Sequence, residues 1–260
     1  MKNVVILGST GSIGKSTIEV IEANKDDFFI AGLVAKSNEK LLTEQAEKFN
    51  VKNVCLTDQT SKNEKFISES KMEDLIAGDQ VDIVVAAISG VVGLKTILKA
   101  VKAGKRVLIA NKEPLVAAGE ILMREAEKYN SEIIPIDSEH CAIHQCLQNI
   151  DKKDLSKVII TCSGGPFLGK KQKDLKEISI EDALNHPVWK MGNKNLIDSA
   201  TLMNKALEII EAKWLFNLSS EEIDVIIHPQ SIIHSMVETT DHSIFAVLSE
   251  PDMKICIAYG

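Results

Sequence analysis

The first half of the chain alternates short apolar runs, rich in β-branched residues, with segments of helical periodicity. We predict strands at Asn3–Leu7, Ile30–Ala35, Asn53–Leu56, Asp82–Ala87, Arg106–Ala110 and Glu132–Ile136. Between them, apolar residues at three- and four-residue spacing predict helices at Ser12–Ala23, Asn38–Phe49, Gly93–Ala103 and Gly119–Tyr129. This alternation is typical of a parallel sheet with crossover helices. We therefore expect an α/β fold that begins with a doubly wound parallel sheet.

The pattern of charged and apolar residues changes near residue 150. Charged stretches such as Asp151–Lys157 and Lys170–Glu177 then surround a few short strands, and a strongly periodic helix is predicted at Met203–Phe216. Hydrophobic residues make up 45% of the 260 positions, which is ample core material for a folded globule. We therefore expect one domain over residues 1–150 and a second, smaller α/β domain over residues 151–260.

Charge and cysteine content argue against several classes of protein. The net charge is −7 and the basic residues are scattered, so neither nucleic acid nor an anionic membrane surface is an expected partner. No stretch is long and apolar enough to cross a bilayer, and the apolar run Val4–Leu7 is too short for a signal peptide. The five cysteines form no Cys-x-x-Cys pair, so we interpret them as reduced thiols and expect a cytoplasmic protein.

A glycine-rich turn follows the first predicted strand and opens the first predicted helix. It consists of Gly8, Ser9, Thr10, Gly11, Ser12, Ile13 and Gly14. Glycines at this spacing permit a tight turn, let the backbone approach a pyrophosphate and let the helix pack closely on the strand. Free N–H groups and the dipole of the helix attract the same anion. The context predicts a Rossmann-like dinucleotide-binding domain.

The end of the second predicted strand indicates which dinucleotide is bound. An NAD enzyme places an acidic residue there, on the ribose hydroxyls. This chain instead has Ala35, Lys36, Ser37 and Asn38, and a cation with two hydrogen-bonding side chains suits a 2′-phosphate. We therefore predict NADPH. A shift of the strand end by one residue would bring Glu39 to the ribose instead.

Two acidic residues follow the last predicted strand of the first half. Asp137, Ser138 and Glu139 stand where ligands bind in open α/β sheets, at the carboxyl end of a strand. Capping of a helix would also explain this group. A zinc site at His140, Cys141 and His144 is a weaker alternative, because the chain has no His-Glu-x-x-His motif.

A second polar group lies at the start of the predicted helix over residues 203–216. Asn204, Lys205 and Glu208 share one side of the helix, and Leu207, Ile210 and Trp214 are expected to face the core. With Ser199, the amide and ammonium groups at the helix start are donors suited to a phosphate. Glu208, joined to Asp137 and Glu139, would give an all-oxygen site that suits Mg²⁺ or Mn²⁺.

Two loops add further candidate residues. Ser163 precedes two glycines and a proline, so it offers a hydroxyl beside flexible amides. His186, Trp189 and Met191 combine a titratable ring with two large apolar groups in a turn-rich stretch. Packing in a core is the commoner fate of such a tryptophan, but its neighbours favour a binding loop.

Eight motifs occur in one collinear series. They are GSTGSIG at Gly8–Gly14, NKE at Asn111–Glu113, DSEH at Asp137–His140, SGGPF at Ser163–Phe167, HPVWKMG at His186–Gly192, DSATLMNKALE at Asp198–Glu208, HPQSIIHSMV at His228–Val237 and EPDM at Glu250–Met253. Together they resemble the 1-deoxy-D-xylulose 5-phosphate reductoisomerase family. The resemblance implies an enzyme of the non-mevalonate isoprenoid pathway. Such an enzyme rearranges 1-deoxy-D-xylulose 5-phosphate and reduces it with NADPH to 2-C-methyl-D-erythritol 4-phosphate.

The resemblance also assigns roles to residues. It implies a Mg²⁺ or Mn²⁺ site at Asp137, Glu139 and Glu208, and a catalytic group of Lys112, Glu139, His186 and His228. Cofactor contacts would include Asn111, Lys112 and Glu113 beside the glycine-rich turn and the segment Ala35–Asn38. The implied substrate-binding residues are Ser138, Ser163, His186, Trp189, Met191, Ser199, Asn204, Lys205 and Glu208.

The resemblance further implies a homodimer and a helical C-terminal domain that this chain lacks. Two other functions stay open at the level of the sequence. One is a metal-independent, NADP-dependent dehydrogenase of a small phosphorylated metabolite, and the other is a non-catalytic nucleotide-binding fragment.

Overall fold

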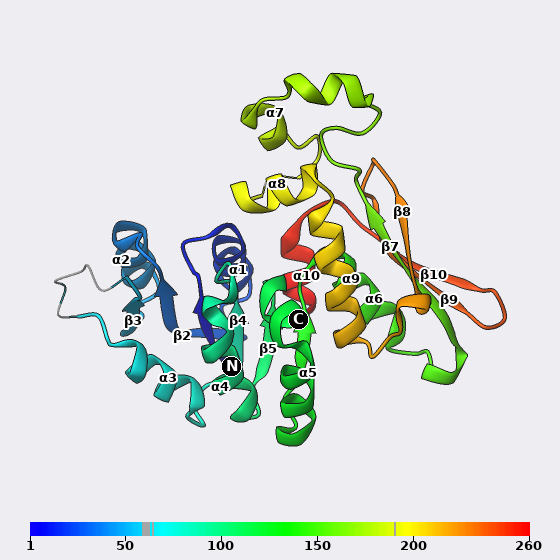
Figure 1. Ribbon diagram of the computed structural model, residues 1–260. Coiled ribbons are helices and arrows are strands. Elements are labelled where there is room, and N and C mark those ends of the chain that lie inside the picture. Colours follow the sequence, from blue (N-terminus) through cyan, green and yellow to red (C-terminus); the bar gives the residue numbers. More distant parts are fainter. Residues whose placement is uncertain (59–62, 64, 190) are drawn as a thin grey trace. The chain divides into compact units, whose positions relative to one another are not determined.

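The computed structural model describes residues 1–58, 63, 65–189 and 191–260, and the chain divides into two compact units. The first unit comprises Met1–Asp137 together with Met253–Gly260, and the second comprises Ser138–Asp252. Figure 1 shows the first unit in blue to green, with its final segment in red, and the second in green to orange.

Six parallel strands form the sheet of the first unit, in the order β3-β2-β1-β4-β5-β6 (Figure 1). Their bounds are β1 Lys2–Leu7, β2 Phe28–Ala35, β3 Asn53–Leu56, β4 Ile83–Ala86, β5 Arg106–Ile109 and β6 Ile133–Pro135. All six predicted strands are confirmed to within two residues at each end. The order reverses between β1 and β4, which is the Rossmann arrangement, and ligands bind beyond the carboxyl ends of the strands at such a reversal.

Helices connect these strands. Their bounds are α1 Ser12–Ala23, α2 Glu39–Lys48, α3 Glu69–Ala77, α4 Leu94–Lys102 and α5 Lys112–Tyr129, with a 3₁₀ turn η1 at Val91–Gly93. Each buries one apolar stripe, as Ile18 and Ile21 do in α1. The sequence did not predict α3, a short helix that begins after Ser68, whose hydroxyl accepts a hydrogen bond from the backbone N–H of Lys71.

Helix α5 begins seven residues before the predicted start at Gly119. Pro114 lies in its first turn, where a missing N–H costs no helical hydrogen bond. The backbone of Ala118 leaves helical geometry, with φ −148°, so the helix is kinked there. The kink separates the NKE segment from the periodic part of the helix, which explains why periodicity detected only the second part.

The last described helix, α10 at Met253–Tyr259, returns to the first unit and packs against α1. Lys254 forms an ion pair with Glu19 at 3.3 Å. The guanidinium of Arg106 donates a hydrogen bond to the carbonyl of Gly260 at 3.2 Å. Residues 253–260 therefore belong to the first unit, whereas the sequence placed them in the second domain.

The second unit has a mixed sheet in the order β10-β9-β7-β8. Its strands are β7 Leu155–Cys162, β8 Ile223–Ile227, β9 Ile233–Thr239 and β10 Ile244–Leu248. Strand β7 runs parallel to β8 and antiparallel to β9. The helices of this unit are α6 Ser138–Leu147, α7 Ile180–Leu184, α8 Asn193–Ala200 and α9 Met203–Leu215, with 3₁₀ turns η2 Lys152–Asp154, η3 Gln172–Glu177 and η4 Ser220–Glu222.

The core of the second unit explains why it begins earlier than the predicted boundary near residue 150. Ile143 of α6 is fully buried in a cluster with Val158 of β7, Ala212 of α9 and Val237 of β9. Helix α6 is therefore part of this core, and the charged stretch that follows it lies on the surface. The change to charged residues near residue 150 therefore indicates a surface segment of the second unit and not the division between the units.

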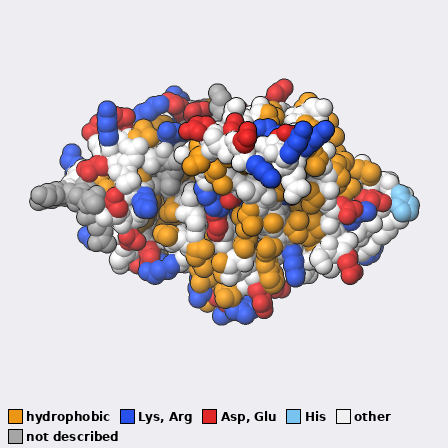
Figure 2. Space-filling model, turned by 45° about the horizontal axis from the view of Figure 1, so that its top comes forward, with side chains coloured by type: hydrophobic (Ala, Val, Ile, Leu, Met, Phe, Trp, Pro, Cys, Tyr) orange, Lys and Arg blue, Asp and Glu red, His pale blue; other side chains and the backbone are white. Residues whose placement is uncertain are grey.

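Basic and acidic side chains are interspersed on the face shown in Figure 2, in keeping with the scattered charges of the sequence. None of the helices in the described part of the chain combines the length and the hydropathy that a bilayer crossing requires.

Candidate active site

The glycine-rich turn between β1 and α1 has the backbone geometry that a dinucleotide site requires. Gly8 has φ +87°, and a Cβ atom there would lie 2.4 Å from the carbonyl oxygen of Ala87. A Cβ atom on Gly14 would lie 2.3 Å from the carbonyl oxygen of Gly8. Gly11 precedes α1, whose first turn has no side-chain cap and no acidic residue. The first amides of α1 thus face no carboxylate of their own helix.

Ser9, a predicted cofactor contact in this turn, also makes structural contacts. Its side chain is fully buried, and its backbone N–H donates to the carbonyl of Val34. Its carbonyl accepts a hydrogen bond from the side chain of Gln45 at 3.0 Å. Ser9 therefore joins β1 to β2 and α2, whereas Thr10 is half-buried and Ser12 is exposed.

The segment after β2 presents Lys36 and Ser37 to solvent, while Ala35 is buried. The side-chain oxygen of Asn38 accepts a hydrogen bond from the backbone N–H of Leu41, so Asn38 is the N-cap of α2. The cofactor contact predicted for Asn38 thus stays a prediction beside its role as a cap. Strand β2 ends at the predicted residue, and Glu39 is already in the helix.

The NKE segment lies at the end of β5. The side-chain amide of Asn111 donates to the carbonyls of Ile88 and Gly90, at 2.5 Å and 2.6 Å. These bonds tie the turn after β4 to the start of α5. Lys112 is buried and forms an ion pair with Asp137, while Glu113 is half-buried.

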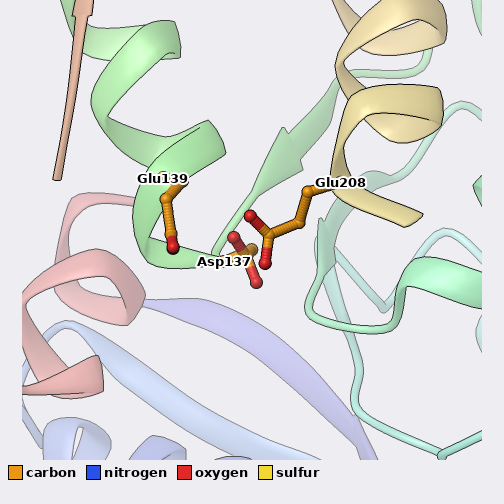
Figure 3. A group of neighbouring side chains, drawn as sticks. All are labelled: Asp137, Glu139 and Glu208. Carbon is orange, nitrogen blue, oxygen red and sulfur yellow. The ribbon is translucent and has the colours of Figure 1, made fainter. Parts of the chain in front are cut away.

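Three carboxylates come together at the acidic motif. One oxygen each of Asp137, Glu139 and Glu208 lies within 4.8 Å of the others, and Figure 3 shows these side chains extending toward one another. Two oxygens bound to one Mg²⁺ lie at most about 4.2 Å apart, twice the bond length. Small side-chain rotations would therefore let all three bind one ion. Among the described residues this is the only such group, and it contains no histidine or cysteine, which argues against the zinc alternative.

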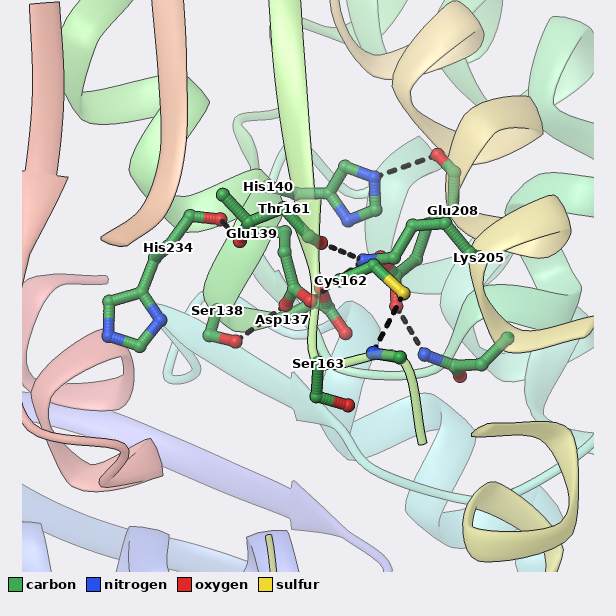
Figure 4. Close-up of polar contacts among 12 residues, drawn as sticks. Asp137, Ser138, Glu139, His140, Thr161, Cys162, Ser163, Lys205, Glu208 and His234 are labelled. Carbon is green, nitrogen blue, oxygen red and sulfur yellow. Dashed lines mark hydrogen bonds and ion pairs between the residues drawn. The ribbon is translucent and has the colours of Figure 1, made fainter. Parts of the chain in front are cut away.

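Lys205 joins two of these carboxylates. Its ammonium donates to Glu139 at 2.8 Å, to Glu208 and to the carbonyl of Thr161 at 2.5 Å (Figure 4). Burial lowers the pKa of Lys205, but the carboxylates of Glu139 and Glu208 outweigh it and hold the pKa above its usual value. Asn204 donates its side-chain amide to Glu208. Thr161 is a contact that sequence reasoning missed, although it lies at the end of a strand.

Helix α9 is oriented differently from the prediction. Glu208 and Glu211 are 1% and 0% exposed, whereas Ile210 is 38% exposed. The polar side of the helix therefore faces inward, where Glu208 contacts Lys205 and Glu211 lies 3.4 Å from His140. Hydrophobic periodicity could not predict this, because it assumes that charged residues face solvent.

The serine–glycine loop lies beside the end of α8. Gly165 has φ +69°, and a Cβ atom there would lie 2.7 Å from the carbonyl oxygen of Ser199. Ser163 accepts a hydrogen bond from the backbone N–H of Gly165 at 3.2 Å. The structure thus brings together the loops of Ser163 and Ser199, although Ser199 lies near the end of α8 and not at the start of α9.

His186 fixes the loop that contains Trp189. Its Nδ1 accepts hydrogen bonds from the backbone N–H groups of Val188 and Trp189, at 3.1 Å and 2.9 Å. Its Nε2 therefore carries the proton in the neutral ring and donates to the hydroxyl of Ser163 at 2.9 Å. Burial lowers the pKa of His186, so the neutral form is favoured. The ring of Trp189 lies 6.1 Å from that of His234, and Met191 is half-buried.

His228 and Ser138 both make local hydrogen bonds. Nε2 of His228 accepts from the backbone N–H groups of Ile232 and Ile233, at 3.2 Å and 3.1 Å, so the ring holds the turn between β8 and β9. The hydroxyl of Ser138 donates to Glu139 at 2.6 Å and orients that carboxylate.

Comparison with known proteins gives a consistent result. Residues 4–119 match the family 1-deoxy-D-xylulose 5-phosphate reductoisomerase, and residues 133–216 match its C-terminal domain family. The chain is 49% identical to the 1-deoxy-D-xylulose 5-phosphate reductoisomerase of Thermoanaerobacter sp. (strain X514), with all of this chain and 70% of that protein covered. It is also 49% identical to the enzyme of the same name from Clostridium botulinum (strain Eklund 17B / Type B), of which 71% is covered.

Solved structures agree with the sequence relatives. A DOX-P reductoisomerase in complex with NADPH, fosmidomycin and magnesium superposes with a TM-score of 0.92 at 41% identity, covering all of this chain and 69% of that one. The Zymomonas mobilis enzyme in complex with NADPH gives a TM-score of 0.89 at 38% identity, covering 98% of this chain and 69% of that one. With this identity and coverage, the chain belongs to the 1-deoxy-D-xylulose 5-phosphate reductoisomerase family.

Proposed function

We propose that the chain rearranges 1-deoxy-D-xylulose 5-phosphate and reduces it to 2-C-methyl-D-erythritol 4-phosphate, with NADPH and a divalent cation. The observation that carries this proposal is the convergence of Asp137, Glu139 and Glu208 beside the ammonium of Lys205. A dehydrogenase that needs no metal would have no use for three converging carboxylates. The relatives whose structures contain NADPH and magnesium support the same assignment.

The residues present fit a hard divalent cation. Asp137, Glu139 and Glu208 offer only oxygen ligands, which suits Mg²⁺ or Mn²⁺. When bound, such an ion would polarise a substrate carbonyl and stabilise the negative charge that develops on its oxygen. Ser138 holds Glu139 in place through a hydrogen bond, and Lys112 holds Asp137 in place through an ion pair.

Four donors are proposed to hold the substrate phosphate: Ser163, Ser199, Asn204 and Lys205. Because Ser163 accepts hydrogen bonds from His186 and Gly165, its own hydroxyl proton can be donated to a phosphate oxygen. Asn204 contacts Glu208 and Lys205 contacts Glu139, so each would exchange a carboxylate for a phosphate when the substrate binds. Holding the phosphate orients the rest of the substrate for reaction.

The loop of His186, Trp189 and Met191 is proposed to cover the substrate and exclude water. Neutral His186 sets the path of this loop through its two backbone contacts, and it links the loop to Ser163. We propose that His228 acts near the reacting carbons mainly by shaping the turn between β8 and β9.

NADPH is proposed to bind at the glycine-rich turn, with Lys36 and Ser37 on the 2′-phosphate. It would supply the hydride for the reduction. Glycines 8, 11 and 14 keep the turn open to a pyrophosphate, and Asn111 fixes the neighbouring turn after β4.

A homodimer and a cytoplasmic location are also proposed. Strands β8 and β10 are the edges of the second sheet and carry exposed apolar side chains, including Ile227 at 55% and Ile244 at 57%. A second copy of the chain would remove these from water. The five free cysteines suit a reducing compartment.

The test is NADPH oxidation by the purified chain with 1-deoxy-D-xylulose 5-phosphate and Mn²⁺. We expect turnover that EDTA abolishes and added Mn²⁺ restores. Turnover that persists in EDTA would identify the metal-independent dehydrogenase. NADPH binding without turnover in the presence of metal, measured also on the chain extended to the full length of its relatives, would identify the non-catalytic alternative.

A further inference from the structure

A histidine and a glutamate that the proposed reaction does not use lie fully buried beside the carboxylates of the second unit. His140 of α6 directly follows Glu139, and Glu211 of α9 lies three residues after Glu208. Both are 0% exposed. Nδ1 of His140 lies 3.4 Å from a carboxylate oxygen of Glu211. The two residues thus pair across the two helices that carry Glu139 and Glu208.

The other ring nitrogen of His140 contacts the backbone of Glu208 itself. Nε2 donates to the main-chain carbonyl of Glu208 at 2.9 Å (Figure 4). The face of the ring stacks on Phe216, with centroids 6.3 Å apart and planes 28° from parallel. The ring is therefore held on both nitrogens and on one face, so its orientation is fixed from three sides.

Apolar residues of α6 and α9 also share a core. Ile143 lies three residues after His140, Ala212 directly follows Glu211, and both belong to the same buried cluster. A buried polar pair is weak evidence for stability, since apolar residues of similar volume are often as stable or more stable. What His140 adds is direction, because its hydrogen bond to the Glu208 carbonyl fixes the axial position of one helix against the other and apolar contacts do not.

We propose that His140 and Glu211 are positioning residues of the metal centre. This rests on the proposed assignment of Glu139 and Glu208 as ligands. The peptide bond from Glu139 to His140 and the hydrogen bond from His140 to Glu208 form a short link between the backbones of two ligands. Glu211 and Phe216 aim the ring that makes this link. The link fixes the separation of the two carboxylates, and with it the size of cation that they favour.

A fixed separation has a consequence for selectivity. Mg²⁺ requires oxygens at about 2.0–2.1 Å in near-octahedral geometry, whereas Ca²⁺ accepts 2.3–2.6 Å and irregular geometry. A site whose backbones are held together favours the smaller ion. Loosening α6 against α9 should therefore weaken binding of Mn²⁺, a close stand-in for Mg²⁺, more than binding of Ca²⁺.

Two substitutions separate the contacts of the ring. His140→Gln places an amide donor near the position of Nε2 and keeps the bond to the Glu208 carbonyl, whereas His140→Asn places it near Nδ1 and keeps the contact with Glu211. The measurement is Mn²⁺ binding without substrate, by titration calorimetry or by the spectrum of free Mn²⁺, with Ca²⁺ as competitor. Thermal unfolding and NADPH affinity are measured on the same samples. His144→Gln, in the same helix, is the matched control.

We expect His140→Asn to weaken Mn²⁺ binding about 10- to 100-fold, as loss of an outer support of a metal site typically does, and to reduce the preference for Mn²⁺ over Ca²⁺. His140→Gln should stay several-fold closer to the unsubstituted chain. NADPH affinity should be unchanged in both. Equal Mn²⁺ affinity in the two variants, whether normal or reduced, would show that the pair serves stability alone and would overturn the proposal.

If neither single variant folds, the double variant His140→Leu, Glu211→Leu provides the test, because it leaves no unpaired buried charge. We expect it to unfold at a normal temperature while binding Mn²⁺ at least about tenfold more weakly. Normal Mn²⁺ affinity in this variant would overturn the proposal. Absence of Mn²⁺ binding by the unsubstituted chain would instead refute the ligand assignment, so the two failures can be told apart.

Discussion

The predicted ligand site of the first unit is formed by main-chain atoms, whereas that of the second unit is formed by charged side chains. At the glycine-rich turn, the geometry depends on Gly8 and Gly14, where any Cβ atom would collide with main-chain atoms. In the second unit, Lys205 and Glu208 are almost fully buried and contact each other. A site formed by main-chain atoms depends on glycines, which have no Cβ atom. A site formed by side chains depends on which charged residues are present. The two should therefore respond to different substitutions.

The largest effect should come from Glu208→Gln. This change removes a buried charge that contacts Lys205 and Asn204, and breaking such a group typically costs about 3–5 kcal/mol. We expect Mn²⁺ affinity to fall by about 10²- to 10³-fold, with NADPH affinity unchanged. The control is Glu222→Gln, which alters an exposed pair with Lys152. Titration calorimetry with Mn²⁺ and with NADPH checks this. A loss of NADPH binding in Glu208→Gln would contradict the claim that the two sites respond to different substitutions.

A reciprocal effect is expected for Gly14→Ala. The added methyl would lie 2.3 Å from the carbonyl of Gly8 and 2.5 Å from Cα of Ser9, so the start of α1 must move away from β1. We expect a loss of about 1–3 kcal/mol of unfolding free energy and NADPH affinity reduced by about tenfold or more. Mn²⁺ affinity should not change.

Gly78→Ala is the matched control for this experiment. Its φ is −73° and its nearest non-neighbouring atom would be 3.3 Å from the new methyl. Denaturation and fluorescence titration with NADPH should separate the two variants. If Gly14→Ala bound NADPH normally, the cofactor assignment of the turn would be wrong.

A smaller effect should follow Lys36→Ala, because Lys36 is exposed. Hydrogen bonds to charged groups are worth about 1.5–3 kcal/mol, and at an exposed position the lower end applies, about tenfold in affinity. We expect NADPH to bind about tenfold more weakly and NADH to bind as before. Lys40→Ala, also exposed, is the control. Equal loss for both dinucleotides would place the 2′-phosphate elsewhere.

The smallest effect concerns pH. Burial lowers the pKa of His186 in the folded chain below the ordinary value of 6.5, so the unfolded chain binds this proton first as the pH falls. The contribution of His186 to stability is therefore complete above pH 6.5 and is lost as the pH falls below it. In His186→Gln, unfolding free energy should depend less steeply on pH in that window. Unchanged steepness would mean that burial does not lower the pKa of His186 in the folded chain.

The sequence was most informative where local rules decide the structure. Strand β3 at Asn53–Leu56 and helix α1 at Ser12–Ala23 have the predicted bounds, because continuous apolar runs and helical spacing depend on neighbouring residues. The motifs also identified three acids that do converge. That convergence could not come from periodicity, since Glu208 lies far along the chain from Glu139.

The missed features depend on long-range contacts. Nothing near Ser9 or Asn38 in the sequence indicates that Ser9 joins two strands or that Asn38 caps a helix. The inward orientation of Glu211 requires His140 from another helix, and neither residue alone indicates the pair. The division at Ser138 follows from the burial of Ile143, which the charged stretch beyond it concealed.

The return of α10 to the first unit has a consequence for the order of folding during synthesis. All contacts internal to the second unit involve residues that emerge before Met253, while the first unit waits for a helix made after the whole insertion. Bringing α10 back to α1 closes a loop that contains the whole second unit, and the entropy lost in closing it is larger than for contacts between neighbouring elements. During synthesis the inserted unit can therefore fold completely while the surface of α1 that packs against α10 is still exposed to water.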